Sequence, residues 1–213
     1  MELIRCKKRN CVACDLPDSK IEQIAGQLKI GKLVVYPTET LYGLGANPFD
    51  ETAVKRVYMI KNRPFDMPLS IAVRDGSMLE ELAVVDDMTR KLIAKFTPGP
   101  ITILVTKKRN VPDILTSASM EIGVRIPNHP FALRLIEKSG PIVSTSANLH
   151  SRPNPTDADT AIKDIGQSVD ICVDCGPCRV GKPSTIVQLS EGGLEIIRQG
   201  AIPKDEIEAV LNE

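Results

Sequence analysis

Short apolar runs alternate with amphipathic segments along most of the chain, separated by Pro, Gly or polar turn residues. Segments 21–29 and 51–61 repeat apolar residues three or four positions apart, which predicts helices with one buried face. Asp50 stands directly before the second segment and is a typical N-cap residue. The pattern predicts further helices at 77–83, 86–96, 130–138, 156–165 and 203–211, and strands at 3–6, 32–37, 69–73, 101–107, 122–127, 141–148, 169–174, 184–189 and 194–200.

The order of these elements predicts the fold class. Strands and helices interleave, yet hairpin-like strand pairs also occur, most clearly around residues 191–193. This mixture favours an α/β (α+β) fold with a mixed sheet. The 213 residues are enough for one sizeable core. We expect a single domain over residues 16–213, preceded by a cysteine-containing segment over residues 1–15.

The composition narrows the classes of function. Lys plus Arg and Asp plus Glu both number 27, so an anion site must come from a local cluster of cations. Aromatic residues make up 3% of the chain, which disfavours a base-stacking surface for nucleic acid. No apolar run approaches the ~20 residues of a membrane span, and the first residues do not resemble a secretory signal. The sequence therefore predicts a cytoplasmic protein that does not bind membranes.

Six cysteines fall into two clusters, one near the N-terminus and one between residues 172 and 178. Both contain C-x-x-C spacings, which suit zinc because two such thiolates reach one tetrahedral ion. Unligated thiols in a terminal strand and a loop are the alternative, since a cytoplasmic protein keeps its thiols reduced. The cysteines expected to bind zinc, if it is bound, are Cys11, Cys14, Cys172 and Cys175.

The segment GPCRVGKPST, residues 176–185, contains most of a phosphate-binding P-loop. Pro183 stands where that motif requires Ser or Thr after Lys182, and proline lacks a backbone N–H. The following residues are patterned as a strand, whereas a P-loop leads into a helix whose N-terminus faces the phosphate. We therefore interpret residues 176–182 as a turn between two strands.

Three polar segments are better candidates for a ligand site. PTETLYGLG follows a buried strand and carries hydroxyls and glycines, although a loop capped by its own Thr side chains has the same composition. Lys61 and Arg63 lie at the end of a predicted helix. STSAN ends a buried strand, where open α/β sheets bind ligands. With Arg125 and Arg198 at the ends of two further strands, these segments predict a pocket for a polyanion.

Seven segments resemble, in order and with tight spacing, the motifs of the YrdC-like family, which includes the L-threonylcarbamoyladenylate synthases of tRNA modification. They extend from about residue 33 to residue 200 and are YPTETLYGLG, KNRPFDMPL, PGPITILV, VRIPNHP, PIVSTSAN, PSTIV and IIRQG. Jointly they are highly specific, although each alone is not. The resemblance implies an open, twisted mixed sheet surrounded by helices, with a large, positively charged concave groove.

The resemblance also implies an enzyme, a nucleotidyltransferase. The family's reaction joins L-threonine, bicarbonate and ATP to give threonylcarbamoyl-AMP and pyrophosphate. A threonylcarbamoyl transferase complex then modifies the adenosine beside the tRNA anticodon. Because a carbamate oxygen attacks the α-phosphorus, no protein nucleophile is required, and Mg²⁺ on the phosphates is expected.

Roles follow from the place of each residue in these motifs. Lys61 and Arg63 resemble the family's K-x-R pair, which meets the phosphates, and are the expected catalytic residues. Arg125 is expected to hold the α-carboxylate of threonine, because a bidentate arginine suits a carboxylate. Further expected ATP contacts are Ser146, Asn148, Asn154 and Arg198, and further threonine contacts are Thr40, Ser144 and Ser184.

Three residues depart from the family pattern. Met67 and Ala72 stand where relatives often carry a polar residue and a histidine, so one ATP contact and one threonine contact are in question. Glu121 replaces a frequent Thr or Ser and would repel phosphate unless it points away or helps to bind metal. The chain resembles the short form of the family, without the C-terminal domain of longer members.

Two other functions are alternatives to the synthase. One is a module that binds double-stranded RNA or tRNA, or a ribosome-assembly factor, which the zero net charge and the scarcity of aromatic residues disfavour. The other is a carbamoyl-adenylate-forming domain of the kind found in hydrogenase maturation. Such domains occur in much longer chains with additional modules.

Overall fold

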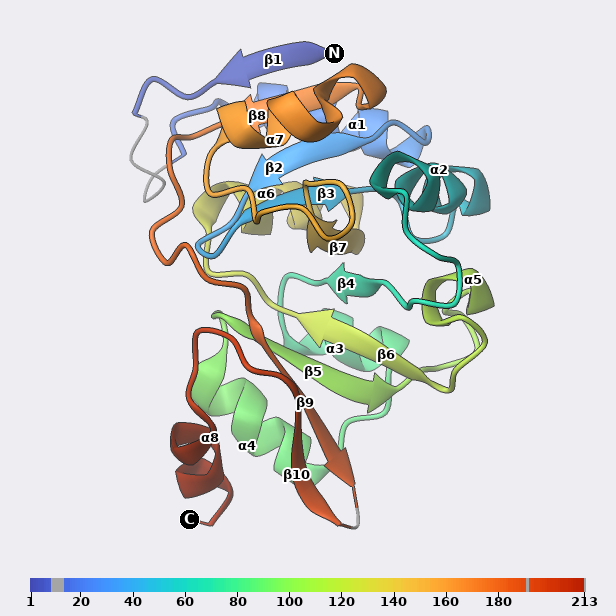
Figure 1. Cartoon of the computed structure of the whole chain (residues 1–213), viewed down its shortest axis with the longest axis vertical. Coiled ribbons are helices and arrows are strands. Elements are labelled where there is room, and N and C mark those ends of the chain that lie inside the picture. Colours follow the sequence, from blue (N-terminus) through green and yellow to red (C-terminus); the bar gives the residue numbers. More distant parts are fainter. Residues whose placement is uncertain (9–13, 191, 213) are drawn as a thin grey trace.

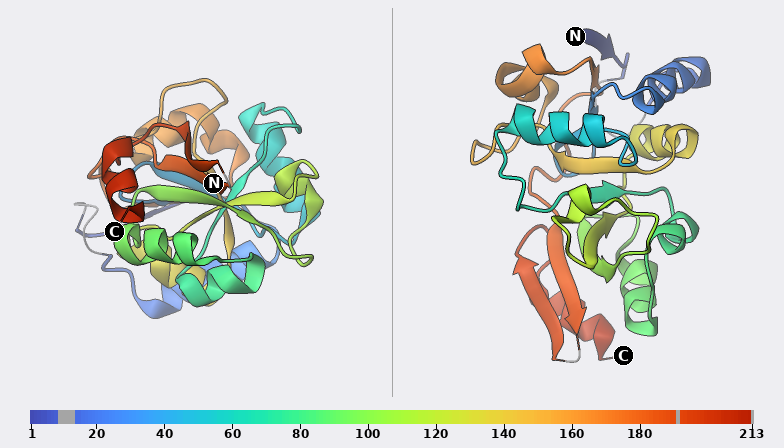
Figure 2. Two further views of the ribbon diagram at one scale, coloured as in Figure 1. Left: turned by 90° about the horizontal axis from the view of Figure 1, so that it is seen from below. Right: turned by 90° about the vertical axis from the view of Figure 1, so that its right-hand side faces the viewer.

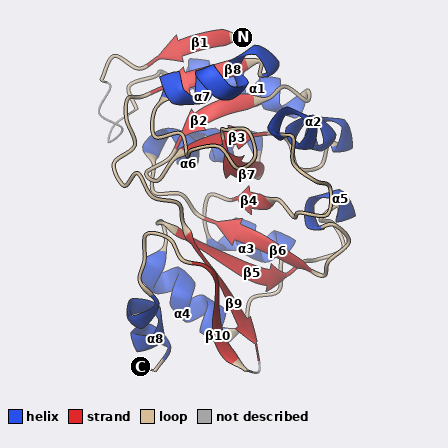
Figure 3. Ribbon diagram, in the orientation of Figure 1, coloured by secondary structure: helices blue, strands red, loops and turns tan. Residues whose placement is uncertain are grey.

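The computed structural model describes residues 1–8, 14–190 and 192–212. Its strands are β1 (Glu2–Arg5), β2 (Val34–Pro37), β3 (Tyr42–Gly45), β4 (Ser70–Ala72), β5 (Ile101–Thr106), β6 (Glu121–Arg125), β7 (Ile142–Ser146), β8 (Ile171–Asp174), β9 (Thr185–Ser190) and β10 (Gly193–Arg198). In the described residues they form one sheet in the order β1-β8-β2-β3-β7-β4-β6-β5-β9-β10 (Figure 1). For example, β2 lies parallel to β8 and antiparallel to β3. The predicted mixed α/β sheet is confirmed (Figure 3).

Helices cover both faces of this sheet. They are α1 (Asp18–Lys29), α2 (Glu51–Lys61), α3 (Gly76–Leu82), α4 (Asp87–Phe96), α5 (Asp113–Thr116), α6 (Pro130–Ser139), α7 (Ala158–Ile165) and α8 (Lys204–Leu211), with a 3-10 turn at Gly166–Ser168. Figure 2 shows α1, α3, α4 and α6 on one face, with α2 and α7 on the other. Within the described residues, none of these helices is long and apolar enough to cross a membrane.

Several helices begin at a side chain that caps the first turn. The Oδ1 atom of Asp50 accepts hydrogen bonds from the backbone N–H groups of Thr52 and Ala53, at 2.9 and 3.1 Å. The predicted N-cap of α2 is therefore confirmed. The same arrangement starts α3, α4, α6 and α7, because a cap satisfies N–H groups that have no partner inside the helix. The capping residues there are Asp75, Asp86, His129 and Asp157.

The two faces of the sheet bury separate apolar clusters, because successive side chains in a strand point to opposite sides. On β2 and the residue before it, Leu33 and Val35 belong to one cluster, and Val34 and Tyr36 to the other. All four are fully buried. This explains why the strand reads as a continuous apolar run with no alternation.

Both ends of the chain take part in this sheet. Residues 1–15, which the sequence sets apart from the domain, contribute the edge strand β1, which pairs in parallel with β8. Near the other end, β9 and β10 form the predicted hairpin. Between β8 and β9, Gly176 and Gly181 have φ values of 91° and 66°, in the left-handed region that favours glycine. Since β9 follows these glycines and no helix does, residues 176–182 form a turn, as predicted, and not a P-loop.

Candidate active site

A pocket of about 180 Å³ lies in the middle of the sheet, where eight elements or their flanking loops meet. It is lined by residues from β3 and the loop before it, the segment after α2, strands β4, β5, β6 and β7, and the β9–β10 hairpin. The structure brings together here eight of the ten residues that the sequence assigned to ATP or threonine. They are Thr40, Arg63, Arg125, Ser144, Ser146, Asn154, Ser184 and Arg198.

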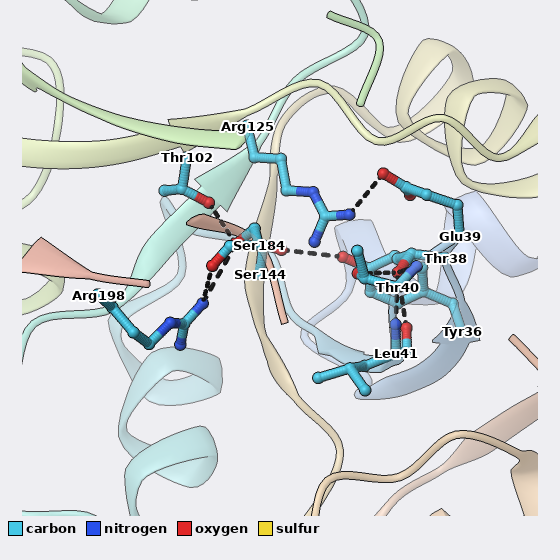
Figure 4. A network of polar contacts seen from close by, with 10 residues as sticks. All are labelled: Tyr36, Thr38, Glu39, Thr40, Leu41, Thr102, Arg125, Ser144, Ser184 and Arg198. Carbon is cyan, nitrogen blue, oxygen red and sulfur yellow. Dashed lines mark hydrogen bonds and ion pairs between the residues drawn. The ribbon is translucent and has the colours of Figure 1, made fainter. Parts of the chain in front are cut away.

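Three arginines give the pocket its charge. The guanidinium of Arg63 donates to the backbone carbonyls of Met67 and Pro68, at 3.1 and 2.9 Å. Arg198 donates from Nη2 to the carbonyl and the hydroxyl of Ser184, at 2.8 and 3.2 Å (Figure 4). Both contacts fix the direction of a guanidinium while leaving its charge uncompensated. No carboxylate belongs to the described residues that line the pocket.

The positive charges of the pocket arginines repel one another. Part of the Arg198 side chain is exposed, but burial around its guanidinium lowers its pKa, and the charges of Arg125 and Arg63 lower it further. Burial also lowers the pKa of Arg63. Each shift records a cost of keeping positive charge in a partly dry space. An anion bound between these groups relieves that cost, so the pocket is suited to phosphate or carboxylate groups.

The third arginine carries its own counter-ion. Nη2 of Arg125 lies 2.7 Å from Oε1 of Glu39, and only 9% and 2% of the two side chains are exposed. Neither Oε2 of Glu39 nor Nε of Arg125 has a hydrogen-bond partner among the described residues. The sequence reasoning missed Glu39, although it is the single carboxylate of the PTETLYGLG segment. The pair therefore buries one acceptor atom and one donor atom that have no partner among these residues.

Hydroxyl groups surround these charges. The Oγ1 atom of Thr38 accepts from the backbone N–H groups of Thr40 and Leu41, so part of this loop is a self-capped turn. The Oγ atoms of Ser184 and Thr102 are 2.8 Å apart, and Thr102 also lines the pocket (Figure 4). Sequence reasoning missed Thr102, which stands in a mainly apolar strand outside the three polar segments.

Lys61 and Asn148 are not among the residues that line the pocket. Lys61 is 2% exposed, and its Nζ donates to the carbonyl of Ser146 and to the carbonyl and Oδ1 of Asn148. Burial, with a contribution from the charge of Arg63, lowers the pKa of Lys61 to about 7. The Asn148 side chain in turn donates to the carbonyls of residues 152 and 153, next to Asn154. The two residues thus hold the loop behind the pocket wall.

The three departures from the family pattern lie outside the described lining of the pocket. Ala72 is fully buried in the apolar cluster under α1 and α6. Glu121 points to β9, where its Oε1 accepts a hydrogen bond of 2.6 Å from Gln188. Met67 serves Arg63 through its backbone carbonyl, which any residue supplies. Glu121 therefore adds no negative charge to the described lining of the pocket.

The cysteines gather in a set that differs from the predicted one. The Sγ atoms of Cys6, Cys14 and Cys175 lie within 4.8 Å of one another, on the face of α1 and α6. Cys172 belongs to the opposite cluster, because residues three apart in an extended strand point to opposite faces, and burial raises its pKa to about 12. Hydrogen bonds from Cys175 and Cys6 lower the pKa of the Cys14 thiol. Cys11 lies outside the described residues.

Comparisons with known proteins identify the family of the chain. The Sua5/YciO/YrdC family model, described as telomere recombination, matches residues 26–200. A protein of Methanocaldococcus jannaschii named putative threonylcarbamoyl-AMP synthase is 42% identical over 183 residues, 86% of each chain. The threonylcarbamoyl-AMP synthase of Pyrococcus abyssi is 41% identical over 196 residues, 91% of this chain but 58% of its own length.

Two solved structures share the fold. P. abyssi Sua5, complexed with L-threonine, superposes with a TM-score of 0.93 at 39% identity, over 100% of this chain and 62% of that one. E. coli YciO gives a TM-score of 0.82 at 27% identity, over 94% and 96% of the two chains. The family model and the first of these relatives each cover most of the sequence. The chain belongs to the Sua5/YciO/YrdC family.

Proposed function

We propose that the protein is a threonylcarbamoyl-AMP synthase, which converts L-threonine, bicarbonate and ATP into threonylcarbamoyl-AMP and pyrophosphate. The names of its relatives and the threonine complex of P. abyssi Sua5 support this function. The observation that carries the proposal is the pocket itself, which combines three arginines with hydroxyls from five separate segments. A substrate set that contains a carboxylate, a carbamate and a triphosphate needs this much positive charge in one place.

The Arg125–Glu39 pair is the proposed site for the amino acid. A free amino acid has a carboxylate and an amine on the same carbon, and a buried pair of opposite charges matches both. The unpartnered Nε of Arg125 can donate to the α-carboxylate, and the unpartnered Oε2 of Glu39 can accept from the amine. Arg125 lines the pocket together with Thr40, Ser144 and Ser184, which offer hydroxyls to the rest of the amino acid.

Arg63 and Arg198 are the proposed contacts of the triphosphate, with Ser146 and Asn154 beside them. Lys61 and Asn148 act in this proposal by holding the end of β7, where Ser146 lies. Mg²⁺ enters as part of the MgATP substrate. The described pocket lining offers hydroxyls and an amide but no carboxylate for a resident ion, so phosphate oxygens and water supply its ligands.

The proposed chemistry has two steps and needs no protein nucleophile. The nitrogen of threonine bonds to the carbon of bicarbonate and water leaves, which gives the carbamate. One carbamate oxygen then attacks the α-phosphorus as the bond to the β-phosphate oxygen breaks, and pyrophosphate leaves with that electron pair. Arg63 and Arg198 stabilise the negative charge that develops on the phosphates, and the pocket aligns the two anions.

The product has a further destination in this proposal. Threonylcarbamoyl-AMP is an activated acyl donor, and a separate threonylcarbamoyl transferase complex passes its acyl group to tRNA. Adding such a complex and a tRNA transcript to the reaction should yield threonylcarbamoyladenosine, detectable by mass spectrometry of the nucleosides. Direct binding of tRNA to this chain is not required.

Pyrophosphate release tests the proposed function. Purified protein is incubated with ATP, Mg²⁺, bicarbonate and L-threonine, and the expected result is release that depends on both threonine and bicarbonate. No threonine-dependent release would refute the proposal. Release that instead requires carbamoyl phosphate would assign the chain to carbamoyl-adenylate formation.

Arg63→Ala tests the pocket within that assay. Its turnover should fall at least about tenfold, because the guanidinium acts on charge that develops in the transition state. The matched control is Arg90→Ala, since Arg90 is an exposed residue of α4 outside the pocket. Equal turnover of the two variants would remove Arg63 from the site.

A further inference from the structure

Two cysteines near the N-terminus meet a third, Cys175, at one edge of the sheet. Cys6 follows β1, Cys14 precedes α1 and Cys175 follows β8. Their Sγ atoms lie within 4.8 Å of one another, with Cys6 and Cys175 buried and Cys14 half-buried. The pocket described above does not include any of them among its described lining residues. Their meeting is therefore a separate feature of the molecule.

Strand pairing accounts for two of the three positions. In the parallel pair of β1 and β8, Arg5 lies opposite Asp174, and the N–H of Cys6 donates to the carbonyl of Asp174 at 2.8 Å. The next residues along both strands are Cys6 and Cys175. Opposite residues of neighbouring strands point to the same face of a sheet, so the register places both thiols together.

Further contacts place Cys14 beside them. The carboxylate of Asp15 accepts hydrogen bonds of 3.0 Å from the backbone N–H groups of both Lys7 and Lys8, which joins the residues after Cys6 to those after Cys14. Arg134 of α6 donates to the carbonyl of Cys14 at 3.3 Å and to that of Leu16 at 2.9 Å. The thiol cluster thus rests on backbone contacts that are independent of the sulfur atoms.

We propose that Cys6, Cys14 and Cys175 bind one Zn²⁺ ion as thiolates. Zinc–sulfur bonds of about 2.3 Å in a tetrahedral site place two sulfurs about 3.8 Å apart, within the range of the cluster. The Sγ atoms of Cys6 and Cys175 are 2.7 Å apart, so these two side chains separate by about 1 Å on binding. Each thiol that binds releases its proton to solvent, and the cation of Arg134 beside Cys14 offsets the negative charge of the site.

Such a site would join the N-terminal segment to the sheet and touch the active site at one point. The N–H of Cys175 donates to the hydroxyl of Tyr42 at 3.2 Å, and that hydroxyl donates to the carbonyl of Gly176 at 2.8 Å. Tyr42 lines the pocket. The zinc would thereby fix the start of the segment that leads from Cys175 to Ser184. This inference does not rest on the proposed synthase activity.

Metal analysis of the full chain, purified under reducing conditions without a histidine tag, is the first test. We expect about one zinc per chain. Cys6→Ser and Cys175→Ser should each reduce the zinc content about tenfold or more, because serine oxygen is a poor replacement for thiolate. The matched control is Cys178→Ser, since Cys178 has C-x-x-C spacing with Cys175 but lies outside the cluster. Loss of zinc from the Cys178 variant to the same degree would overturn the proposed ligand set.

Cobalt binding keeps the proposal testable if a variant fails to fold. The wild-type chain is stripped with a chelator and titrated with Co²⁺, which should give thiolate-to-metal charge-transfer absorption that saturates at about one equivalent. Zn²⁺ should then displace the colour and raise Tm above that of the stripped chain. The proposal is wrong if the reduced chain gives no charge-transfer band, or if mass spectrometry of the freshly purified chain shows a disulfide between Cys6 and Cys175 in place of bound metal.

Discussion

Replacing Glu39 by Gln removes the counter-ion of Arg125 while keeping the shape of the side chain. In the wild type the two charged groups are 2.7 Å apart and at most 9% of either side chain is exposed. In Glu39→Gln the guanidinium stays buried and shares the pocket with Arg63 and Arg198, whose charges are also uncompensated. The variant therefore tests how much this arrangement of charges costs the folded protein.

The expected magnitude is large for a single substitution. Removing one member of a buried ion pair costs about 3–5 kcal/mol, because the remaining charge is left without compensation. Gln can still accept one hydrogen bond from Arg125, which places the expected loss toward the lower end. Since 1 kcal/mol shifts Tm by about 2–4 °C in a chain of this size, a loss of about 3 kcal/mol should lower Tm by roughly 6–12 °C.

Urea unfolding at pH 7 measures the loss of stability, and calorimetric titration with L-threonine measures the loss of affinity for threonine. The affinity for threonine should fall at least about tenfold, or about 1.4 kcal/mol, because the amine loses its charged acceptor. Glu208→Gln is the control, since Glu208 pairs with Lys204 at 3.1 Å on the exposed face of α8 and should change stability by less than about 1 kcal/mol. If Glu39→Gln matched this control in stability, the expected cost of leaving Arg125 without its counter-ion would be wrong. If it bound threonine as tightly as the wild type, the assignment of the pair to the amino acid would be refuted.

Other substitutions test Lys61 behind the pocket wall and Arg198 in the pocket. Burial lowers the pKa of Lys61 from 10.5 to about 7. Between pH 7 and pH 10.5 the unfolded chain therefore binds more protons than the folded chain, so the folded state becomes more stable as the pH rises. The free energy of unfolding should increase by about 2 kcal/mol between pH 7 and pH 9. Urea unfolding of Lys61→Met should lack this gain, and equal pH dependence in both proteins would mean that the surrounding oxygens keep the ammonium charged. Arg198→Gln should lower kcat/KM for ATP at least about tenfold while Arg90→Gln should not, and equal loss in both would exclude a specific phosphate contact.

Much of the fold could be predicted because periodicity is a local signal. The runs at 32–37 and 101–107 contain strands, and Asp50 caps α2, as its position in the sequence predicts. The order of the strands could not be predicted in the same way. The pairing of Glu2 with Ile171 depends on contacts between residues far apart in sequence, which no local pattern encodes.

The same limit explains the thiol cluster. A C-x-x-C pair reaches one metal ion only where the chain turns, but Cys172 lies within β8 and Cys175 just beyond it. Extended backbone sends these two side chains to opposite faces, so spacing alone suggested the wrong partner for Cys175. The correct neighbour, Cys6, follows from the register of two strands and not from any motif.

Glu39 shows a different limit, which concerns charge. A carboxylate beside a predicted anion pocket reads as repulsive when the sequence is considered alone. Its partner Arg125 lies 86 positions away, so the neutral pair that they form is visible only in three dimensions. The hydroxyl groups of the same segment could be predicted as ligands because each is useful without a distant partner.

Lys61 and Arg63 show how two residues of one motif take different places in the structure. The resemblance to the family's K-x-R pair assigns both residues to the phosphates. Lys61 is instead the last residue of α2, and Asn62 takes a left-handed conformation at φ 49° and ψ 43° that turns the chain before Arg63. The turn sends one cation into the wall, where it fixes the carbonyls of Ser146 and Asn148, and leaves the other in the pocket. In the proposed function the motif thus supplies one cation that holds the loop and one that meets the ligand.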